Sequence, residues 1–185
     1  MLRTDTTLKA ALRRVMKSGA ARRMTSCEAG AAAVEFALIA VPFLATVFWI
    51  INTALVFFAQ QTLQTATDQA ARLVMTGQAQ QQGLSAQQFK QGVCANAAAL
   101  FSCSGISLNI QTFSSFSSGS MYNPNKNGTF DNSGFSYSLG NSGDIEVIQV
   151  FYQWPVFGTL LGSLSNMGVG YRLLVATAAF RNEPY

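Results

Sequence analysis

A run of 24 uncharged, mostly apolar residues, FALIAVPFLATVFWIINTALVFFA at positions 36–59, limits what this chain can fold into more than any other feature. As an α-helix, the run would be about 36 Å long, at about 1.5 Å per residue. That length crosses a hydrocarbon core of about 30 Å with some tilt. Pro42 lies inside the run and is expected to kink the helix. We therefore predict a membrane-spanning helix, with a buried helix of a soluble protein as the alternative.

The basic residues are concentrated before this run. Residues 1–29 contain seven Lys and Arg against two Asp and Glu, whereas the other 156 residues contain five against six. A basic head is also typical of a disordered tail or a nucleic-acid patch. Because this head directly precedes an apolar run, it indicates the cytoplasmic anchor of a helix whose C-terminal side lies outside the cytoplasm. We expect a membrane partner and no nucleic acid.

The order of these segments differs from that of a secretory signal peptide. Such a peptide has an apolar region of about 7–15 residues, followed by small residues at the cleavage site. Here the apolar run is longer, and the small residues, at 29–33, come before it. Cleavage among them would remove the basic head and leave the apolar helix on the mature protein.

Glu35 stands at the start of the apolar run, where an ionised carboxylate costs about 2.5–3.5 kcal/mol if it enters hydrocarbon. It is the fifth residue after Gly30, and the aromatic Phe36 is the sixth. Gly30 followed by AAAVEF resembles the processing site of type IVb prepilins, a glycine followed by four residues, a glutamate and an aromatic residue. The resemblance implies that a membrane aspartyl prepilin peptidase cuts the Gly30–Ala31 bond on the cytoplasmic side and leaves residues 31–185.

Cutting this bond would create a positively charged α-amine on Ala31. In an assembly of parallel helices, the Glu35 carboxylate of one subunit could pair with the Ala31 amine of its neighbour, so that each charge offsets the desolvation of the other. Such a pair would set the axial register of the subunits. A glutamate that simply remains in the headgroup zone is the alternative.

The helical pattern continues past the apolar run to Thr76. Asp68 and Arg72 are spaced for an i,i+4 ion pair, and Gly77 suits a helix C-terminus. Apolar residues recur at three- and four-residue spacing: Leu63, Ala66, Ala70, Leu73 and Val74. We expect one long helix over 31–76, whose second half packs on a small domain.

A second, short helix is predicted to begin at Ser85, which forms a capping-box pattern with Gln88. Its apolar stripe would comprise Phe89, Val93, Ala97 and Leu100. Cys94 and Cys103 lie nine residues apart and can form a disulfide in an oxidising compartment. Cys27 falls in the leader, so cleavage would leave an even number of cysteines.

Three further segments have strand patterns. Residues 106–110 alternate with Ile106, Leu108 and Ile110 on one face, and residues 144–154 are rich in β-branched and aromatic side chains up to Pro155. Residues 169–180 are predicted as the closing strand, with one face formed by Val169, Tyr171, Leu173 and Val175.

The segments between these strands have different compositions. Residues 114–143 contain nine Ser, five Gly and five Asn, which predicts a long, mobile surface hairpin or loop. Residues 154–168 form an apolar turn that we expect to cap the sheet edge. Contact of this turn with the membrane or a partner is the alternative.

The C-terminal sequence RNEPY, at 181–185, and VEFAL, at 34–38, are similar to sequences of the TadE-like group of Flp pilus assembly proteins. The resemblance implies a TadE- or TadF-type minor pseudopilin of the tight-adherence system, and it leaves open which of the two. The implied partners are the prepilin peptidase, the major Flp pilin, other minor pseudopilins and the assembly platform of the bacterial inner membrane.

The expected fold is α+β, with a long transmembrane pilin-like helix packed on a small antiparallel β-sheet domain that has a second short helix. The predicted parts are a basic prepilin leader (1–30), the long helix (31–76, membrane part 36–59) and an extracytoplasmic domain (77–185) with a flexible 114–143 loop. The implied location is the inner membrane, with a cytoplasmic N-terminus and a periplasmic C-terminal domain, from which a pilus could incorporate the protein.

The chain has no histidine, which excludes Ser-His-Asp and Cys-His catalysis and imidazole metal ligands. Asp144 and Glu146 could act as an acid–base pair or bind Ca²⁺, and Asp131 could belong to a Ca²⁺ loop. A polar strand edge and an ordinary turn account for these patterns more simply. We expect no catalytic residue, cofactor or metal. Competing hypotheses are an uncleaved membrane-anchored binding or adhesion protein and, less well supported, an anchored periplasmic enzyme.

Overall fold

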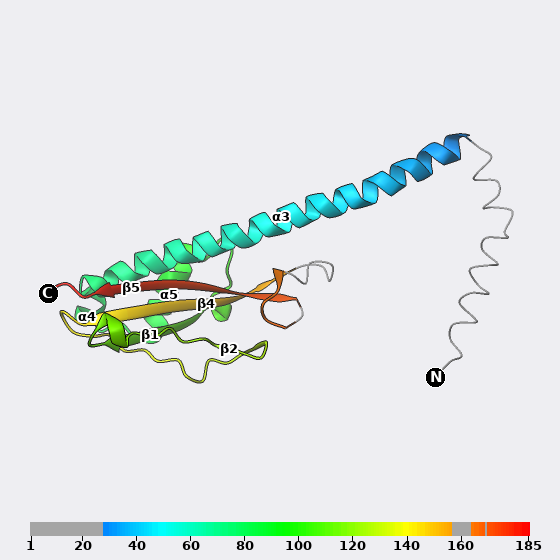
Figure 1. The fold of residues 1–185 in the computed structure, drawn as a ribbon. Coiled ribbons are helices and arrows are strands. Elements are labelled where there is room, and N and C mark those ends of the chain that lie inside the picture. Colours follow the sequence, from blue (N-terminus) through cyan, green and yellow to red (C-terminus); the bar gives the residue numbers. More distant parts are fainter. Residues whose placement is uncertain (1–27, 157–163, 169) are drawn as a thin grey trace, which may run out of the picture. The chain divides into compact units, whose positions relative to one another are not determined.

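The computed structural model describes residues 28–156, 164–168 and 170–185. The predicted basic leader up to Cys27 and the centre of the apolar turn, residues 157–163, lie outside the described residues. The chain divides into two compact units, Met1–Ile50 and Ile51–Tyr185. Its elements run in the order α3 (Glu28–Met75), α4 (Gln78–Gln81), α5 (Ala86–Ala97), β1 (Ser107–Phe113), β2 (Asn125–Lys126), β3 (Thr129–Phe130), β4 (Ile145–Pro155) and β5 (Tyr171–Arg181), as Figure 1 shows.

The long N-terminal helix α3 is present as one continuous helix of 48 residues, with Pro42 in its interior. Several threonines, which are poor helix formers, donate their hydroxyl hydrogen bonds to the carbonyl four residues earlier. Thr46 donates to Pro42 O at 2.8 Å, and Thr67 donates to Leu63 O at 2.8 Å. These bonds keep the hydroxyls satisfied inside the helix, so the threonines do not interrupt it.

The second half of α3 carries the apolar stripe predicted from the sequence. Its buried apolar residues recur every three or four positions: Val56, Ala59, Leu63, Ala66, Ala70 and Val74. The predicted stop is also confirmed, because Gly77 adopts a left-handed conformation with φ of 74° directly after the helix. The short helix α4, which sequence reasoning did not predict, follows immediately.

The second predicted helix is confirmed as α5, with Ser85 as its N-cap. The Ser85 hydroxyl accepts a hydrogen bond from Gln88 N at 3.3 Å, and Ser85 N donates to Gln88 Oε1 at 2.9 Å, which completes the capping box. Phe89, Val93 and Ala97 are buried as expected. The predicted disulfide is present and joins Cys94 in α5 to Cys103 just after it, with their Cα atoms 5.5 Å apart.

The three long strands form an antiparallel sheet in the order β1-β4-β5. One face of the sheet packs against the second half of α3 and against α5 (Figure 1). This main core contains the predicted Ile106 and Ile110, which are fully buried, and partners from the other strands, Ile148, Val150, Leu174 and Ala176. The long helix on a small antiparallel sheet, with a further short helix, confirms the α+β expectation.

The Ser-, Gly- and Asn-rich segment 114–143 reaches the opposite face of the sheet through Phe130 and Phe135, whereas its Tyr137 and Leu139 pack against the main core. Phe135 stacks on Phe151 of β4 with ring centroids 5.0 Å apart, and Phe130 contacts both rings. Leu173 and Met167 complete this second, smaller core. Paired strands within the segment are limited to β2 and β3, so the predicted long hairpin exists only as a short one. Its flexibility stays a prediction.

Two buried amide side chains attach this segment to the sheet. Asn109 of β1 accepts a hydrogen bond from Ser136 N at 2.9 Å and donates to Gln149 Oε1 of β4 at 3.2 Å. Gln149 in turn accepts from Tyr122 N at 2.9 Å and donates to Tyr122 O at 3.2 Å. Because buried amides are costly unless paired, these bonds specify where the segment lies.

One detail of the sequence prediction differs from the structure. No ion pair joins the described side chains of Asp68 and Arg72, and Asp68 Oδ1 accepts a hydrogen bond from Gln64 Nε2 at 2.8 Å. On β5, Tyr171, Leu173 and Val175 share one face as predicted; Leu173 is buried in the second core, whereas Tyr171 and Val175 are exposed. The opposite face, with Leu174 and Ala176, packs on the helices. Val169 lies outside the described residues.

Candidate processing and assembly site

The Gly30–Ala31 bond, the predicted cleavage site, lies in α3 close to its first described residue, Glu28. Glycine costs about 1 kcal/mol relative to alanine inside a helix. Gly30 therefore lowers the local stability of α3 at this bond. Ala31 is exposed and Gly30 is partly exposed.

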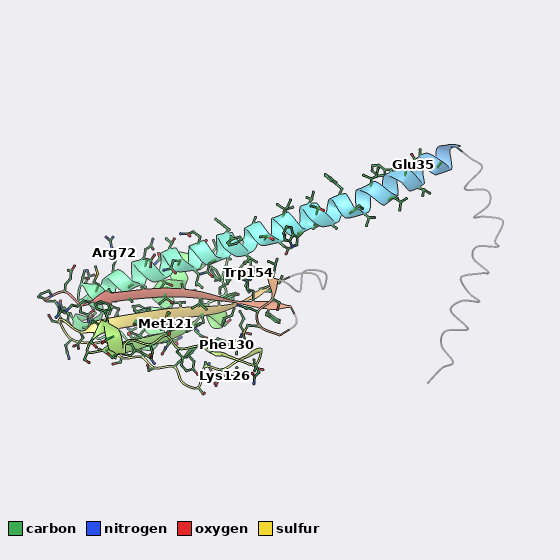
Figure 2. The ribbon with its side chains drawn as sticks, in the orientation of Figure 1. Glu35, Arg72, Met121, Lys126, Phe130 and Trp154 are labelled. Carbon is green, nitrogen blue, oxygen red and sulfur yellow. A yellow bond between two sulfur atoms is a disulfide. The ribbon has the colours of Figure 1, made fainter. Side chains whose placement is uncertain are left out.

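Glu35 lies one turn beyond Ala31, near the start of α3 (Figure 2). Residues four apart share one face of a helix, so the Glu35 carboxylate and the Ala31 backbone lie on the same side of α3. The side chain of Glu35 is exposed, and so is its neighbour Phe36, at 74%. Glu35, like the other predicted processing residues, is thus accessible in the isolated chain.

The segment that follows Glu35 is exposed and apolar. In α3, nearly every large side chain between Val34 and Phe58 has about half or more of its surface exposed: Leu38, Ile39, Val41, Phe43, Leu44, Phe48, Trp49, Ile50, Ile51, Leu55 and Phe57. Among the described residues, α3 is the one helix long and apolar enough to cross a membrane, over Gly30–Met75. An exposed apolar surface of this extent requires lipid or protein around it.

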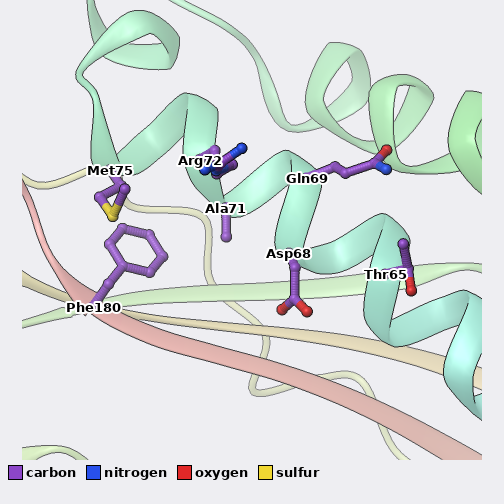
Figure 3. Close-up of a pocket in the computed structure, with 7 residues that line it drawn as sticks. All are labelled: Thr65, Asp68, Gln69, Ala71, Arg72, Met75 and Phe180. Atoms are coloured by element: carbon purple, nitrogen blue, oxygen red, sulfur yellow. The ribbon is translucent and has the colours of Figure 1, made fainter.

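The exposed face of α3 becomes polar in its last turns. There a groove of about 450 Å³ is lined by six residues of α3 and by Phe180 of β5 (Figure 3): Thr65, Asp68, Gln69, Ala71, Arg72 and Met75. Asp68 and Arg72 are the only charged residues of α3 after Glu35. Figure 2 shows Arg72 on the same helix as Glu35, toward its C-terminal end.

The acidic residues singled out from the sequence lie in different surroundings, and the part of the chain that is described contains no cluster of three metal-ligating side chains. Asp131 accepts a hydrogen bond from Ser133 N at 2.9 Å, which is the geometry of an ordinary turn, and the Ser133 hydrogen bonds lower the pKa of this carboxyl. Asp144 precedes β4 and accepts from Asn141 N at 2.8 Å. Only Glu146 is fully buried.

Sequence reasoning missed the surroundings of Glu146. Its Oε1 atom accepts hydrogen bonds from Asn182 Nδ2 at 2.8 Å and from Gly140 N at 2.5 Å. Burial raises the pKa of the Glu146 carboxyl above its ordinary value of 4.5, and the two hydrogen bonds offset part of that rise. The sequence contained one signal of this burial, because Glu146 shares a strand face with the apolar residues Ile148 and Val150.

Comparison with protein families connects this site with a known group. The family described as TadE-like protein matches residues 30–72, a range that begins at Gly30 and ends within α3. Comparisons with curated proteins and with solved structures found no match. The matched range contains Glu35, Phe36, the apolar run and most of the buried stripe of α3. Residues 30–72 are therefore TadE-like, which confirms the resemblance seen at VEFAL. The match does not reach RNEPY at 181–185, so the resemblance of that sequence stays a prediction.

Proposed function

We propose that this protein is a minor pseudopilin, processed after Gly30 by a prepilin peptidase, that takes part in the assembly or initiation of Flp (type IVb) pili. The observation that carries the proposal is the TadE-like match that begins at Gly30 and runs through α3. The exposed Glu35 and the exposed apolar residues after it support a helix that functions inside a membrane or an assembly of helices.

Processing would proceed at the start of α3. A peptidase needs an extended backbone, and the helical turn around Gly30 can unwind without loss of any tertiary contact that depends on the buried core, which begins at Val56. Glycine also allows close approach of an enzyme to the backbone. The products would be the basic leader, residues 1–30, and a chain that begins with the amine of Ala31.

Assembly would follow from the charges at the new N-terminus. The Ala31 amine and Glu35 are separated by four residues, about 6 Å along the helix. A neighbouring parallel subunit displaced by this distance would bring its Ala31 amine level with Glu35. Neither charge is then left unpaired in an apolar environment, whereas other displacements leave both unpaired. The pair would thus select one register.

The domain built on the second half of α3 fits a location outside the cytoplasm. The Cys94–Cys103 disulfide requires an oxidising compartment, and the basic residues before α3 favour a cytoplasmic N-terminus. The partners in this proposal are the prepilin peptidase, the major Flp pilin with other minor pseudopilins, and the inner-membrane assembly platform.

The proposal is tested by the mass and N-terminal peptide of the full-length protein isolated from cells with an active or an inactive prepilin peptidase. We expect a chain that begins at Ala31 only with the active enzyme. Gly30→Leu should retain the leader, whereas Gly19→Leu, a matched change elsewhere in the leader, should not. An intact leader in the presence of the active peptidase contradicts the proposal.

A second candidate function is an uncleaved, membrane-anchored binding or adhesion protein. It is favoured by two exposed apolar side chains in segment 114–143, Phe116 at 64% and Met121 at 72%. This candidate predicts that the leader persists and that Phe116→Ser with Met121→Ser reduces surface attachment of the cells without changing the amount of pili.

A further inference from the structure

The last residues of the chain are held against three other segments of the domain, beside α4 and the end of α3 (Figure 1). Glu183 N donates a hydrogen bond to Met75 O, the last residue of α3, at 2.8 Å. The Tyr185 hydroxyl donates to Gly140 O at 3.2 Å, and its ring occupies the space that a side chain at position 77 would need. The C-terminal segment Asn182–Tyr185 therefore closes the end of the domain.

Gly140 is the point at which these contacts converge. Its carbonyl accepts hydrogen bonds from Tyr185 and from Gln80 Nε2 of α4, at 3.2 Å each. Its N–H donates to Glu146 Oε1, and the same oxygen accepts from Asn182 Nδ2. Asn182 Nδ2 also donates to Asn141 O at 3.1 Å. The position of the C-terminal segment thus depends on the buried side chains of Glu146 and Asn182.

Three side-chain oxygen atoms in this cluster are buried without a hydrogen-bond partner: Gln80 Oε1, Glu146 Oε2 and Asn182 Oδ1. The last two belong to side chains that already bond to each other through their other atoms. Both side chains are almost fully buried, Glu146 at 0% and Asn182 at 3% exposure. A carboxylate and an amide oxygen are both acceptors, so neither can satisfy the other. A proton on Glu146 Oε2 turns that atom into a hydrogen-bond donor. Asn182 Oδ1 is the matching acceptor, because the same amide already donates to Glu146 Oε1 through its Nδ2 atom.

We propose that Glu146 is protonated in the folded protein and forms a neutral, two-hydrogen-bond pair with the Asn182 amide, which fastens the C-terminal segment to the domain in a proton-dependent way. In this pair the acid O–H donates to Asn182 Oδ1 and the amide N–H donates to Glu146 Oε1. No buried atom of the two groups is then left unsatisfied, and no charge is buried.

Among the charged and titratable groups around Glu146, Asp144 is a like charge two residues earlier and raises the pKa of Glu146 further. The hydrogen bonds from Asn182 and Gly140 act in the opposite direction, and burial is the largest cause of the rise. The Tyr137 hydroxyl has its pKa raised, chiefly by burial and also by the negative charge that Glu146 carries when it is ionised. Arg181 Nε donates to Gly143 O at 2.8 Å, and Glu183 and Tyr185 follow in the segment itself. None of these groups forms an ion pair with Glu146 that would favour its charged form.

The direction of the pH effect follows from the raised pKa. Between the ordinary pKa of 4.5 and the higher value of the folded protein, the folded state holds more protons than the unfolded state. Stability therefore falls as the pH rises through this window and is constant above it. Ionisation of Glu146 would loosen Asn182 and, with it, the bonds of Glu183 and Tyr185. The proposal is independent of processing at Gly30.

The first test is the titration of the Glu146 carboxyl, followed by its ¹³C chemical shift in the full-length protein in detergent micelles. A midpoint above 4.5 is expected. The same sample is used for hydrogen exchange of the Gly140 and Glu183 amides, expressed relative to the intrinsic rate at each pH. Their protection should be lower at pH 8 than at pH 4.5, because the folded protein loses the Glu146 proton as the pH rises.

Matched variants separate the proton from the side chain's shape. Glu146→Gln can make the same two hydrogen bonds without a proton, so its amide protection should stay high and independent of pH. Glu146→Ala should lose protection at every pH. Glu183→Gln removes an exposed carboxylate from the same segment and should keep the pH dependence of the unaltered protein.

Two outcomes would overturn the proposal. One is a Glu146 midpoint at or below 4.5, which would mean that the buried carboxyl is ionised when the segment is closed. The other is equal loss of protection in Glu146→Gln and Glu146→Ala, which would mean that the acid is not replaceable by an amide.

Discussion

At the scale of single residues, the roles of Ser85 and Gly77 follow directly from their chemistry. Ser85 begins α5 because its hydroxyl and the Gln88 side chain satisfy N–H groups that a helix start leaves open. Gly77 ends α3 because its φ of 74° is strained for other residues. Glu35 differs from both, since nothing within the described chain requires a carboxylate at that position.

Glu35→Ala tests the role proposed for this carboxylate. The variant should insert in the membrane normally, because insertion does not use the charge. Assembly should be impaired, because the Ala31 amine would lose its partner. Piliation, counted by electron microscopy, measures assembly, and N-terminal mass separates it from a change in processing. Glu28→Ala removes a carboxylate from the leader and should leave piliation unchanged; normal piliation of Glu35→Ala would refute the pairing.

At the scale of elements, side chains of α3 cover the outer edge of β5. Among the described residues, no strand lies beside the outer edge of β5, and such an edge invites pairing with other chains. Gln60 Nε2 of α3 donates to Val175 O at 2.8 Å, and Gln64 accepts from Thr177 N at 3.3 Å and donates to Thr177 O at 3.1 Å. The Asn166 side chain also bonds to the backbone of this edge, because Leu173 N donates to Asn166 Oδ1 at 2.6 Å. Amide side chains thus replace a neighbouring strand.

Gln64→Ala should leave the Thr177 backbone groups without these partners. We expect a loss of about 1–2 kcal/mol in unfolding free energy, measured by chemical denaturation in detergent, and more aggregation through the β5 edge. Gln61→Ala, a glutamine on the exposed side of the same helix, should change stability by less than about 0.5 kcal/mol. Equal effects of the two variants would show that Gln64 does not protect the edge.

The disulfide is the covalent link between α5 and the segment that leads to β1. Replacing both cysteines, Cys94→Ala with Cys103→Ala, should lower the unfolding free energy by about 2–3 kcal/mol, because a short loop is no longer closed in the unfolded state. Cys27→Ala should have no effect on the mature protein. Non-reducing mass analysis gives the thiol count, and free thiols at both positions in protein from the cell envelope would contradict the disulfide.

At the scale of the whole molecule, the sheet is covered on both faces by different means. Helices cover one face with a stripe of aliphatic side chains. The segment 114–143 covers the other with a few aromatic rings and with backbone groups that bond to Asn109 and Gln149. A sequence poor in aliphatic residues can therefore still complete a domain.

Phe135→Ala tests whether this segment stabilises the domain. Loss of the stacking on Phe151 should cost about 2 kcal/mol of unfolding free energy, less than for a fully buried ring because Phe135 is partly exposed. Phe116→Ala, in the same segment but 64% exposed, should have almost no effect. Thermal unfolding at fixed pH gives both values. A destabilisation by Phe116→Ala as large as that by Phe135→Ala would contradict the packing described above.

Local patterns in the sequence were sufficient to predict the long helix, its stop at Gly77, the capping box at Ser85, the three strands and the disulfide. Each of these depends on periodicity, on a backbone preference or on residues close together in the chain, and such signals can be read without a fold. The same holds for the apolar run, whose length alone indicates a membrane.

Only the tertiary structure decided how distant segments pair. The composition of 114–143 indicated a loop and could not reveal that Phe135 packs on Phe151, because contacts between distant residues leave no local pattern. The spacing of Asp68 and Arg72 allows an ion pair but does not require one, because exposed ion pairs contribute little. In the fold, Asp68 Oδ1 accepts a hydrogen bond from Gln64 Nε2. In the sequence, Glu146 is one of two acidic residues near a predicted strand. The fold buries it beside Asn182, which is 36 residues away. Burial changes the chemistry of a carboxyl group, and burial is set by the fold as a whole.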